Sequence, residues 1–173
     1  MAFVMADRAP NKLQRSLMRL DEAPAFMRGF VQNIILRRAV PFTGTAGVQF
    51  VSLTPERVEV RLANEHRVRN HIGSVHASAM NLLAETATGM AVGMNVRDDC
   101  LPLAKELSMA FKKRATGALK AVATLTAEQR AAMQSSDKGE VQVKVTVTDE
   151  AGVEPVECAF TWAWVPSSRP AKN

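Results

Sequence analysis

Apolar residues follow two different periods along the chain, and together these periods predict an α+β protein. Between residues 11 and 40 they recur every three or four positions, as on one face of a helix; they are Leu13, Leu17, Leu20, Phe26, Phe30, Ile34 and Ile35. Beyond residue 45, several short segments alternate apolar with polar residues, which is typical of strands that bury one face. We therefore expect front helices, which end at Pro41, followed by an antiparallel sheet.

Six segments are predicted as strands, joined mainly by hairpins: 48–52, 58–62, 106–114, 118–126, 141–147 and 156–165. The third and fourth are expected to pair with each other around Gly117. The last strand places four large or sulfur-bearing side chains on one face: Cys158, Phe160, Trp162 and Trp164. The spacing of Thr126 and Gln129 fits a capping box and predicts a short helix that continues to Met133.

The longest apolar run, residues 75–94, predicts a central helix without a broad polar face, which the sheet must enclose. Its one carboxylate, Glu85, lies near the middle of the run. Burying a carboxylate is costly unless it is paired. The sequence therefore leaves open an ion pair with a nearby Arg or Lys, a carboxylate kept for catalysis, or a helix end or partial exposure that brings Glu85 near solvent.

The segment in front of this helix can bind an oxyanion. Gly73 is expected in a turn and His76 at the helix start, and the first N–H groups of the helix, near Ala77 and Ser78, have no helical acceptor. Glu85 follows Ala77 by eight residues, which is about 12 Å along a helix. One helix therefore cannot bring both groups into a compact site, whereas a second copy related by a twofold axis can.

The pattern Asn70-x-x-Gly73-x-x-His76-Ala77, followed by Glu85 on a helix rich in alanine and glycine, resembles the motif of the hotdog-fold thioesterases. It is most similar to the phenylacetyl-CoA thioesterase-like group, over residues 45–165. The resemblance implies a hotdog fold, in which a curved antiparallel sheet wraps a long central helix, here with additional N-terminal helices. The expected divisions are an N-terminal helical extension (1–44), a hotdog domain (45–166) and a flexible tail (167–173).

The resemblance also implies an activity, the hydrolysis of an acyl thioester of coenzyme A or of an acyl carrier protein by a homodimer or a tetramer. Glu85 would then act as the general base or nucleophile, and the N–H of Ala77 would polarise the thioester carbonyl. Asn70 would orient water or the carbonyl, and His76 would hold the turn. The family has Gly-Gly where this chain has Ala77-Ser78, and the added Cβ narrows the approach of the thioester.

Further substrate contacts follow from the same resemblance. Gly73 and Ser78 belong to the segment that would bind the thioester. Lys112, Lys113 and Arg114 lie at a predicted strand end where the family often meets the phosphates of coenzyme A, and a solvated strand end is the alternative. Several apolar residues could line an acyl tunnel, with core packing as their alternative role: Phe26, Phe30, Met80, Leu82, Leu83 and Met90.

Composition narrows the classes of function. The 173 residues are 47% hydrophobic, enough for one domain with a core, and their net charge of +5 favours anionic partners. Aromatic residues make up only 5%, with no Tyr, which argues against nucleic-acid binding. The three histidines do not converge, and the two cysteines, Cys100 and Cys158, are too few for a disulfide scaffold. No metal is therefore expected. No cofactor is expected either, because coenzyme A is part of the substrate.

No membrane partner is expected, since the long apolar run contains His76, Asn81 and Glu85. The apolar stretch at residues 2–6 is too short for a secretory signal, so a cytoplasmic location is expected. Two other functions remain open on the same fold. They are a non-catalytic protein that binds acyl thioesters and an enoyl-thioester hydratase.

Overall fold

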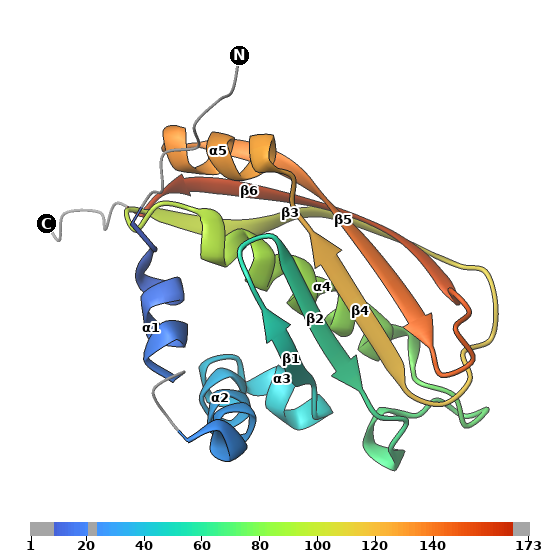
Figure 1. Ribbon diagram of the computed structural model, residues 1–173. Coiled ribbons are helices and arrows are strands. Elements are labelled where there is room, and N and C mark those ends of the chain that lie inside the picture. The colour runs from blue at the N-terminus through green and yellow to red at the C-terminus, as the bar shows by residue number, and fades with distance from the viewer. Residues whose placement is uncertain (1–8, 21–23, 168–173) are drawn as a thin grey trace, which may run out of the picture.

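The computed structural model describes residues 9–20 and 24–167, within which six strands form one antiparallel sheet (Figure 1). Apart from Ser167, the expected tail lies outside the described residues. The helices are α1 (Lys12–Leu20), α2 (Ala25–Ala39), α3 (Pro41–Ala46), the 3₁₀ turn η1 (His66–Val68), α4 (Ala77–Asn95) and α5 (Ala127–Ser135). The strands are β1 (Gln49–Leu53), β2 (Arg57–Leu62), β3 (Cys100–Phe111), β4 (Leu119–Thr124), β5 (Gly139–Asp149) and β6 (Val156–Pro166).

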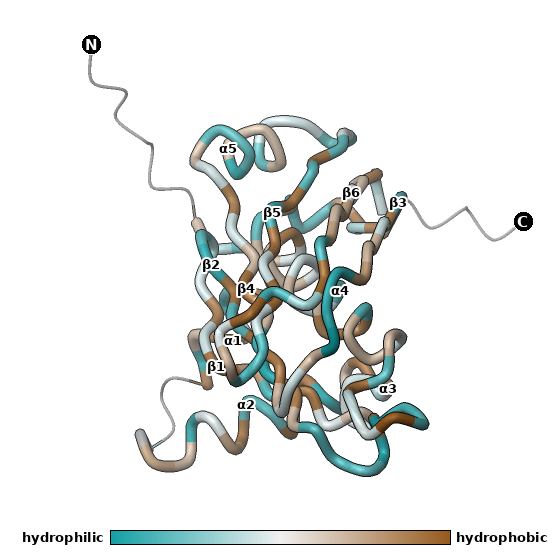
Figure 2. Tube along the Cα trace, turned by 90° about the vertical axis from the view of Figure 1, so that its right-hand side faces the viewer, coloured by the Kyte–Doolittle hydropathy of each residue, from teal (hydrophilic) through white to brown (hydrophobic). Residues whose placement is uncertain are grey.

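The sheet has the strand order β1-β2-β4-β5-β6-β3 and curves around α4. Figure 2 shows β1, β2 and β4 on one side of α4, and β3 and β6 on the other. β5 joins the two halves, because its residues 139–143 pair with β6 and its residues 144–149 pair with β4. The predicted fold, a long helix wrapped by a curved antiparallel sheet with extra N-terminal helices, is confirmed.

The prediction that the third and fourth strands pair with each other is wrong. β3 pairs with β6 and forms one edge of the sheet, whereas β4 lies between β2 and β5. β3 also ends at Phe111, and the chain then passes over the turn between β5 and β6, where the N–H groups of Lys112 and Lys113 donate to the carbonyl oxygen of Pro155. Alternation of polar and apolar residues identifies a strand but does not specify its neighbour.

The helix α4 is buried on one face and only partly covered on the other. The buried face carries small and medium apolar side chains that let β2 and β4 approach closely: Ala79, Met80, Leu83, Ala84, Ala87, Ala91 and Val92. The helix begins at Ala77, because Val75 pairs with Arg69 in an isolated β-bridge and His76 is the extended N-cap. The prediction that the sheet encloses the helix all round is wrong for the face that carries Glu85, which is partly exposed.

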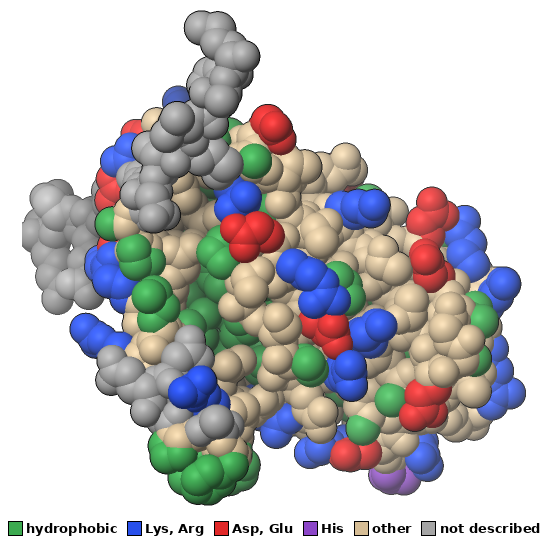
Figure 3. All heavy atoms as spheres, in the orientation of Figure 1, with side chains coloured by type: hydrophobic (Ala, Val, Ile, Leu, Met, Phe, Trp, Pro, Cys, Tyr) green, Lys and Arg blue, Asp and Glu red, His purple; other side chains and the backbone are tan. Residues whose placement is uncertain are grey.

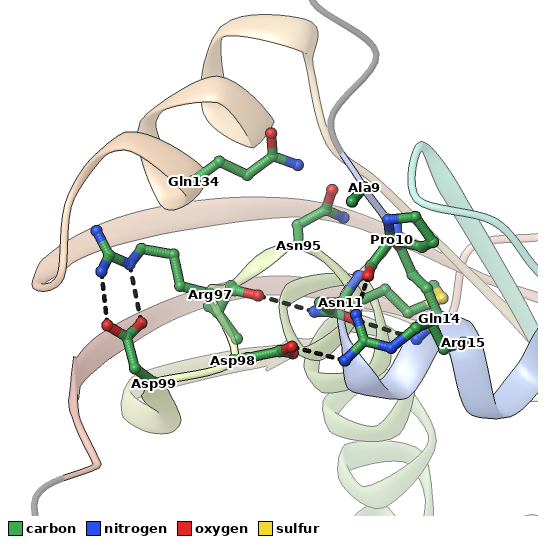
Figure 4. A pocket seen from close by; sticks show the side chains of 12 residues that line it. Ala9, Pro10, Asn11, Gln14, Arg15, Asn95, Arg97, Asp98, Asp99 and Gln134 are labelled. Atoms are coloured by element: carbon green, nitrogen blue, oxygen red, sulfur yellow. Dashed lines mark hydrogen bonds and ion pairs between the residues drawn. The ribbon is translucent and has the colours of Figure 1, made fainter.

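The short helix α1 is attached to the C-terminal end of α4. The side-chain amide of Asn11 donates to the carbonyl oxygens of Gly93 at 2.9 Å and Val96 at 2.8 Å, which have no helical donor at the end of α4. Arg15 forms an ion pair with Asp98 at 2.7 Å across the same junction (Figure 4). α1 therefore covers the last turns of α4.

The next helix, α2, is attached to β1. Asn33 accepts a hydrogen bond from the N–H of Phe50 at 2.8 Å and donates to its carbonyl oxygen at 3.0 Å, as a neighbouring strand would. The Nε of Arg37 donates to the carbonyl oxygen of Val48 at 2.7 Å. The sequence predicted that the front helices end at Pro41, but only α2 ends there. Pro41 is the first residue of α3, where an N–H would have no helical acceptor.

The buried indole of Trp162 provides a test of the core, since its Nε1–H donates to the Oγ1 of Thr88 at 3.0 Å. Thr88→Val keeps the shape but leaves this donor unpaired. We expect the free energy of unfolding, measured by urea denaturation, to fall by about 1–3 kcal/mol. The control Thr45→Val removes an exposed hydrogen bond within α3 and should change the free energy of unfolding by less than about 0.5 kcal/mol. Equal effects of the two variants would contradict this account of the core.

Candidate active site

A groove runs along the partly covered face of α4 and contains a cavity of about 450 Å³. We call it the α4 groove. Figure 3 shows hydrophobic side chains in a hollow between α1 and β1. The residues that line the groove are Leu13, Leu36, Ala39, Val40, Phe42, Thr43, Phe50, Leu82, Glu85, Thr86, Gly89, Met90, Gly93, Pro102 and Trp162. Its volume and largely apolar lining are typical of sites for small organic ligands.

Glu85 is the one ionisable residue that lines the α4 groove. Within residues 9–20 and 24–167, no hydrogen bond or ion pair reaches its carboxylate. Of the interpretations left open by the sequence, partial exposure holds, and the ion pair finds no partner among the described residues. An unpaired carboxylate in an apolar wall adds no ion pair to the fold, and its partial exposure lowers the cost of keeping it charged there.

The position of Glu85 follows from helical spacing. Leu82, Glu85, Thr86, Gly89 and Gly93 recur at three- and four-residue intervals, which places them on one stripe of α4. The two glycines in this stripe let neighbouring side chains approach the helix, since an added Cβ would stand 2.8 Å from the indole of Trp162 at Gly89 and 3.3 Å from a methyl group of Leu13 at Gly93. Trp162 and Leu13 therefore form walls of the groove directly against α4.

One turn before Glu85, the side-chain oxygen of Asn81 is buried and has no hydrogen-bond partner in the described part of the chain. Buried polar atoms without a partner are rare in folded proteins. Residues four apart are neighbours on a helix surface, so Asn81 lies beside the candidate carboxylate. This feature of Asn81 could not be predicted from the sequence, because polarity alone does not reveal a missing partner.

The loop in front of α4 is held by its own hydrogen bonds. The Oδ1 of Asn70 accepts from the N–H groups of Ile72 and Ser74, each at 3.1 Å. Gly73 adopts a φ of 78°, a left-handed conformation that favours glycine, and its carbonyl oxygen accepts from Asn64 at 3.1 Å. The side-chain oxygen of Asn70 therefore positions this loop, rather than standing free for a substrate.

The first turn of α4 leaves one backbone donor open. The Nδ1 of His76 accepts a hydrogen bond from the N–H of Ser78 at 3.0 Å, and the N–H of His76 donates to Val68 at 2.7 Å. The N–H of Ala77 has no acceptor in the described residues, and Ala77 is exposed. Of the two donors expected near the helix start, Ala77 is thus open and Ser78 is occupied.

A second cavity, of about 200 Å³, lies beside the start of α4. Arg67, Arg69, His76 and Ser78 line it, together with Phe42 and other residues. Phe42 and Leu82 also line the α4 groove, so the two cavities share a wall. Neither arginine stands out in the sequence, because exposed cations produce no periodic pattern.

The basic residues predicted at the end of the third strand have other partners. They follow β3 instead of belonging to it. Lys112 pairs with Glu157 at 2.9 Å, and Arg114 donates to the Oγ of Ser74 at 3.1 Å and to the carbonyl oxygen of Ile72. Lys113 alone keeps a side chain without a described partner. Arg114 therefore holds the loop in front of α4, and the role of Lys112, Lys113 and Arg114 in binding a phosphate stays a prediction.

The apolar residues considered for an acyl tunnel fall into separate groups. Phe26 and Phe30 are 85% and 68% exposed in the first turns of α2 and do not line the α4 groove. The other four lie on α4. Leu82 and Met90 line the groove, and Met80 and Leu83 are buried on the other face of the helix.

The fold is that of the hotdog thioesterases, as comparison with solved structures shows. A Pseudomonas aeruginosa protein described as a "Probable Thioesterase" is 25% identical with a TM-score of 0.71, and the match covers 79% of this chain and 94% of that one. A thioesterase from Haemophilus influenzae is 14% identical with a TM-score of 0.60, over 76% of this chain and 87% of that one. A thioesterase family protein from Silicibacter pomeroyi is 17% identical with a TM-score of 0.60, over 80% of this chain and all (100%) of that one.

Residues 30–165 match the family described as "Domain of unknown function (DUF4442)", and the chain belongs to that family. No curated protein matches this chain. The family model begins within α2, so the match includes most of that helix as well as the sheet and α4.

None of the helices in the described residues is long and apolar enough to cross a bilayer. No three His, Cys, Asp or Glu side chains among residues 9–20 and 24–167 converge to hold a metal ion. Cys100 and Cys158 are free thiols, and burial raises the pKa of Cys158 to about 11, so it is protonated at neutral pH and a poor nucleophile.

The contacts of Arg114 lead to a test of the loop. We expect Arg114→Leu to speed amide hydrogen exchange at Gly73 and Ser74 by roughly tenfold, because charge-assisted hydrogen bonds across the loop are lost. Lys113→Leu is the matched control, since it removes the neighbouring cation without removing a described side-chain bond. If the two variants exchange alike, Arg114 does not position the loop.

Proposed function

We propose that this protein hydrolyses an acyl thioester, of coenzyme A or of an acyl carrier protein, at a site shared by two copies of the chain. The observation that carries the proposal is the unpaired carboxylate of Glu85 in the apolar α4 groove. The open N–H of Ala77 at a helix start supplies the second group that the reaction needs. Solved structures with this fold include proteins described as thioesterases.

In the proposed reaction, the carboxylate of Glu85 takes a proton from a water molecule as its oxygen attacks the thioester carbonyl carbon. The N–H of Ala77 from the second copy donates to the developing oxyanion. The tetrahedral intermediate then expels the thiolate as the C–S bond breaks, and the proton on Glu85 passes to sulfur. The products are a free acid and a thiol. Direct attack by Glu85, followed by hydrolysis of the resulting anhydride, gives the same products.

A homodimer is part of this proposal, because Ala77 and Glu85 lie about 12 Å apart along one helix. The edge strand β3 supports it. Within the described residues only one side of β3 is paired, and large apolar side chains on it are exposed: Leu101, Leu103, Leu107 and Phe111. A long apolar edge strand of this kind favours pairing with another strand. Pairing of two such dimers into a tetramer is also compatible with the proposal.

The carrier end of the substrate is assigned to the second cavity. Arg67 and Arg69 there can attract the phosphates of coenzyme A or of a carrier protein's phosphopantetheine arm. Arg67 also pairs with Glu65 at 2.6 Å, but both side chains are about half exposed, so this pair is weak and can yield to a phosphate. The thioester is itself the substrate, so the proposed reaction requires no further cofactor. A cytoplasmic location belongs to the same proposal.

One observation favours the alternative of a non-catalytic thioester-binding protein. The Cβ of Ala77, where the resembled motif has glycine, stands beside the candidate oxyanion donor. The hydratase alternative needs a histidine that converges with an acid, and no acidic side chain of the described residues lines the cavity that contains His76. Hydrolysis therefore has the better support.

Removal of the carboxylate tests hydrolysis directly. We expect Glu85→Gln to lower turnover of acyl-CoA substrates by roughly 10²–10⁴-fold, measured as thiol release with a chromogenic thiol reagent. Glu154→Gln, at an exposed position between β5 and β6, should keep wild-type turnover. Full activity of Glu85→Gln would exclude the mechanism. If the wild-type protein binds acyl-CoA but does not hydrolyse it, the non-catalytic alternative holds.

Mixed dimers test whether the site is shared. Ala77→Pro removes the N–H at the first position of α4, where proline is compatible with the helix and with the extended conformation of His76. Each of Ala77→Pro and Glu85→Gln should be inactive alone. Random mixing should restore roughly a quarter of wild-type activity, because half of the dimers contain one intact site of two. No recovery in verified mixed dimers would show that both groups act within one chain.

A further inference from the structure

Glu85 does not lie at the centre of the α4 groove. The lining residues of α4 run from Leu82 to Gly93, so Glu85 is three residues from one end and eight from the other. At 1.5 Å per residue, these intervals correspond to about 4.5 Å and about 12 Å. The groove therefore has a short arm and a long arm on the two sides of the carboxylate.

The long arm is closed at its far end. Leu13 of α1 lies against Gly93, where an added Cβ would stand 3.3 Å from a methyl group of Leu13. Asn11 holds α1 in this place through its hydrogen bonds to the end of α4. Besides Thr86, the α4 residues of this arm are glycine and methionine, and no charged side chain lines it. A polar group in such a space would lose its hydration without a new hydrogen bond, so the space favours an apolar group.

The short arm leads toward positively charged side chains. It ends at Leu82 and Phe42, which also line the cavity that contains Arg67 and Arg69. Along α4 the surroundings thus change from the cations of the second cavity near the helix start, past the carboxylate of Glu85, to a closed apolar end near Leu13. A ligand with an anionic head and an apolar tail has one favourable orientation along this gradient.

We propose that the groove binds a linear, medium-length acyl chain lengthwise along α4, with its terminal methyl group against Leu13. This inference rests on the proposed function, which it extends to a substrate class. Carbon–carbon bonds near 1.5 Å advance an extended chain by about 1.3 Å per carbon, so about 12 Å holds on the order of ten carbons. The preferred substrates are accordingly decanoyl and dodecanoyl thioesters, and α1 sets the upper limit of chain length.

Binding of hydrolysis-resistant thioethers tests this assignment without any turnover. The probes are S-butyl, S-octyl, S-dodecyl and S-hexadecyl coenzyme A, and calorimetry gives their dissociation constants with the full-length protein. Affinity should rise by up to about fourfold for each added methylene as far as dodecyl, because each is removed from water. It should not rise further for hexadecyl, because α1 closes the arm.

Two variants shift the limit in opposite directions. Gly93→Leu fills the far end, so we expect it to weaken dodecyl binding at least tenfold and leave butyl binding unchanged. Gly29→Leu is the matched control, since this helical glycine of α2 has no atom within 4 Å of an added Cβ and lies outside the groove. Leu13→Ala removes the end wall and should let hexadecyl bind more tightly than dodecyl.

Affinity that does not depend on chain length, or equal losses for butyl and dodecyl in Gly93→Leu, would overturn the assignment. So would the absence of any binding, as expected if side chains of a second copy fill the groove. These outcomes are separable from failure of the proposed function. A length limit that moves with Gly93→Leu and Leu13→Ala supports the assignment even if the protein hydrolyses no thioester.

Discussion

The molecule depends on a helix whose two faces are built differently. On the sheet side of α4, the alanines at 84, 87 and 91 are fully buried, and their small size lets the strands bend closely around the helix. On the other side, Gly89 and Gly93 let Trp162 and Leu13 pack directly against the helix, and residues of α1, α2 and α3 line the groove beside them. The walls of the groove are thus set by side-chain size along one helix and by the N-terminal helices.

Most polar groups around the start of α4 hold the scaffold. Asn70 binds the backbone of its own loop, His76 caps the helix, and Arg114 fastens the loop from the far end of β3. Three groups remain without partners in the described residues, the N–H of Ala77, the side-chain oxygen of Asn81 and the carboxylate of Glu85. Because the surrounding bonds fix the loop and the helix start, the N–H of Ala77 is held in a fixed position. Such preorganisation is what electrostatic catalysis requires.

Features that depend on local pattern could be predicted from the sequence, and features that depend on distant partners could not. Alternation located the strands and the apolar run located α4, but neither indicates that β3 pairs with β6. The place of Glu85 on the helix followed from spacing, whereas its exposure depends on the space that α1–α3 leave open. Lys112 and Arg114 have the charge expected of phosphate ligands, but their contacts with Glu157 and Ser74 could not be predicted from that charge. The dimer and the role of each candidate site residue stay predictions.

The division of β5 between two partners determines how the halves of the sheet hold together. Residues 139–143 pair only with β6 and residues 144–149 only with β4, so within the described chain one strand carries every ladder between the two halves of the sheet. Separation of the halves would require that β5 part from β4 or from β6, so the cohesion of the sheet around α4 depends on this one strand.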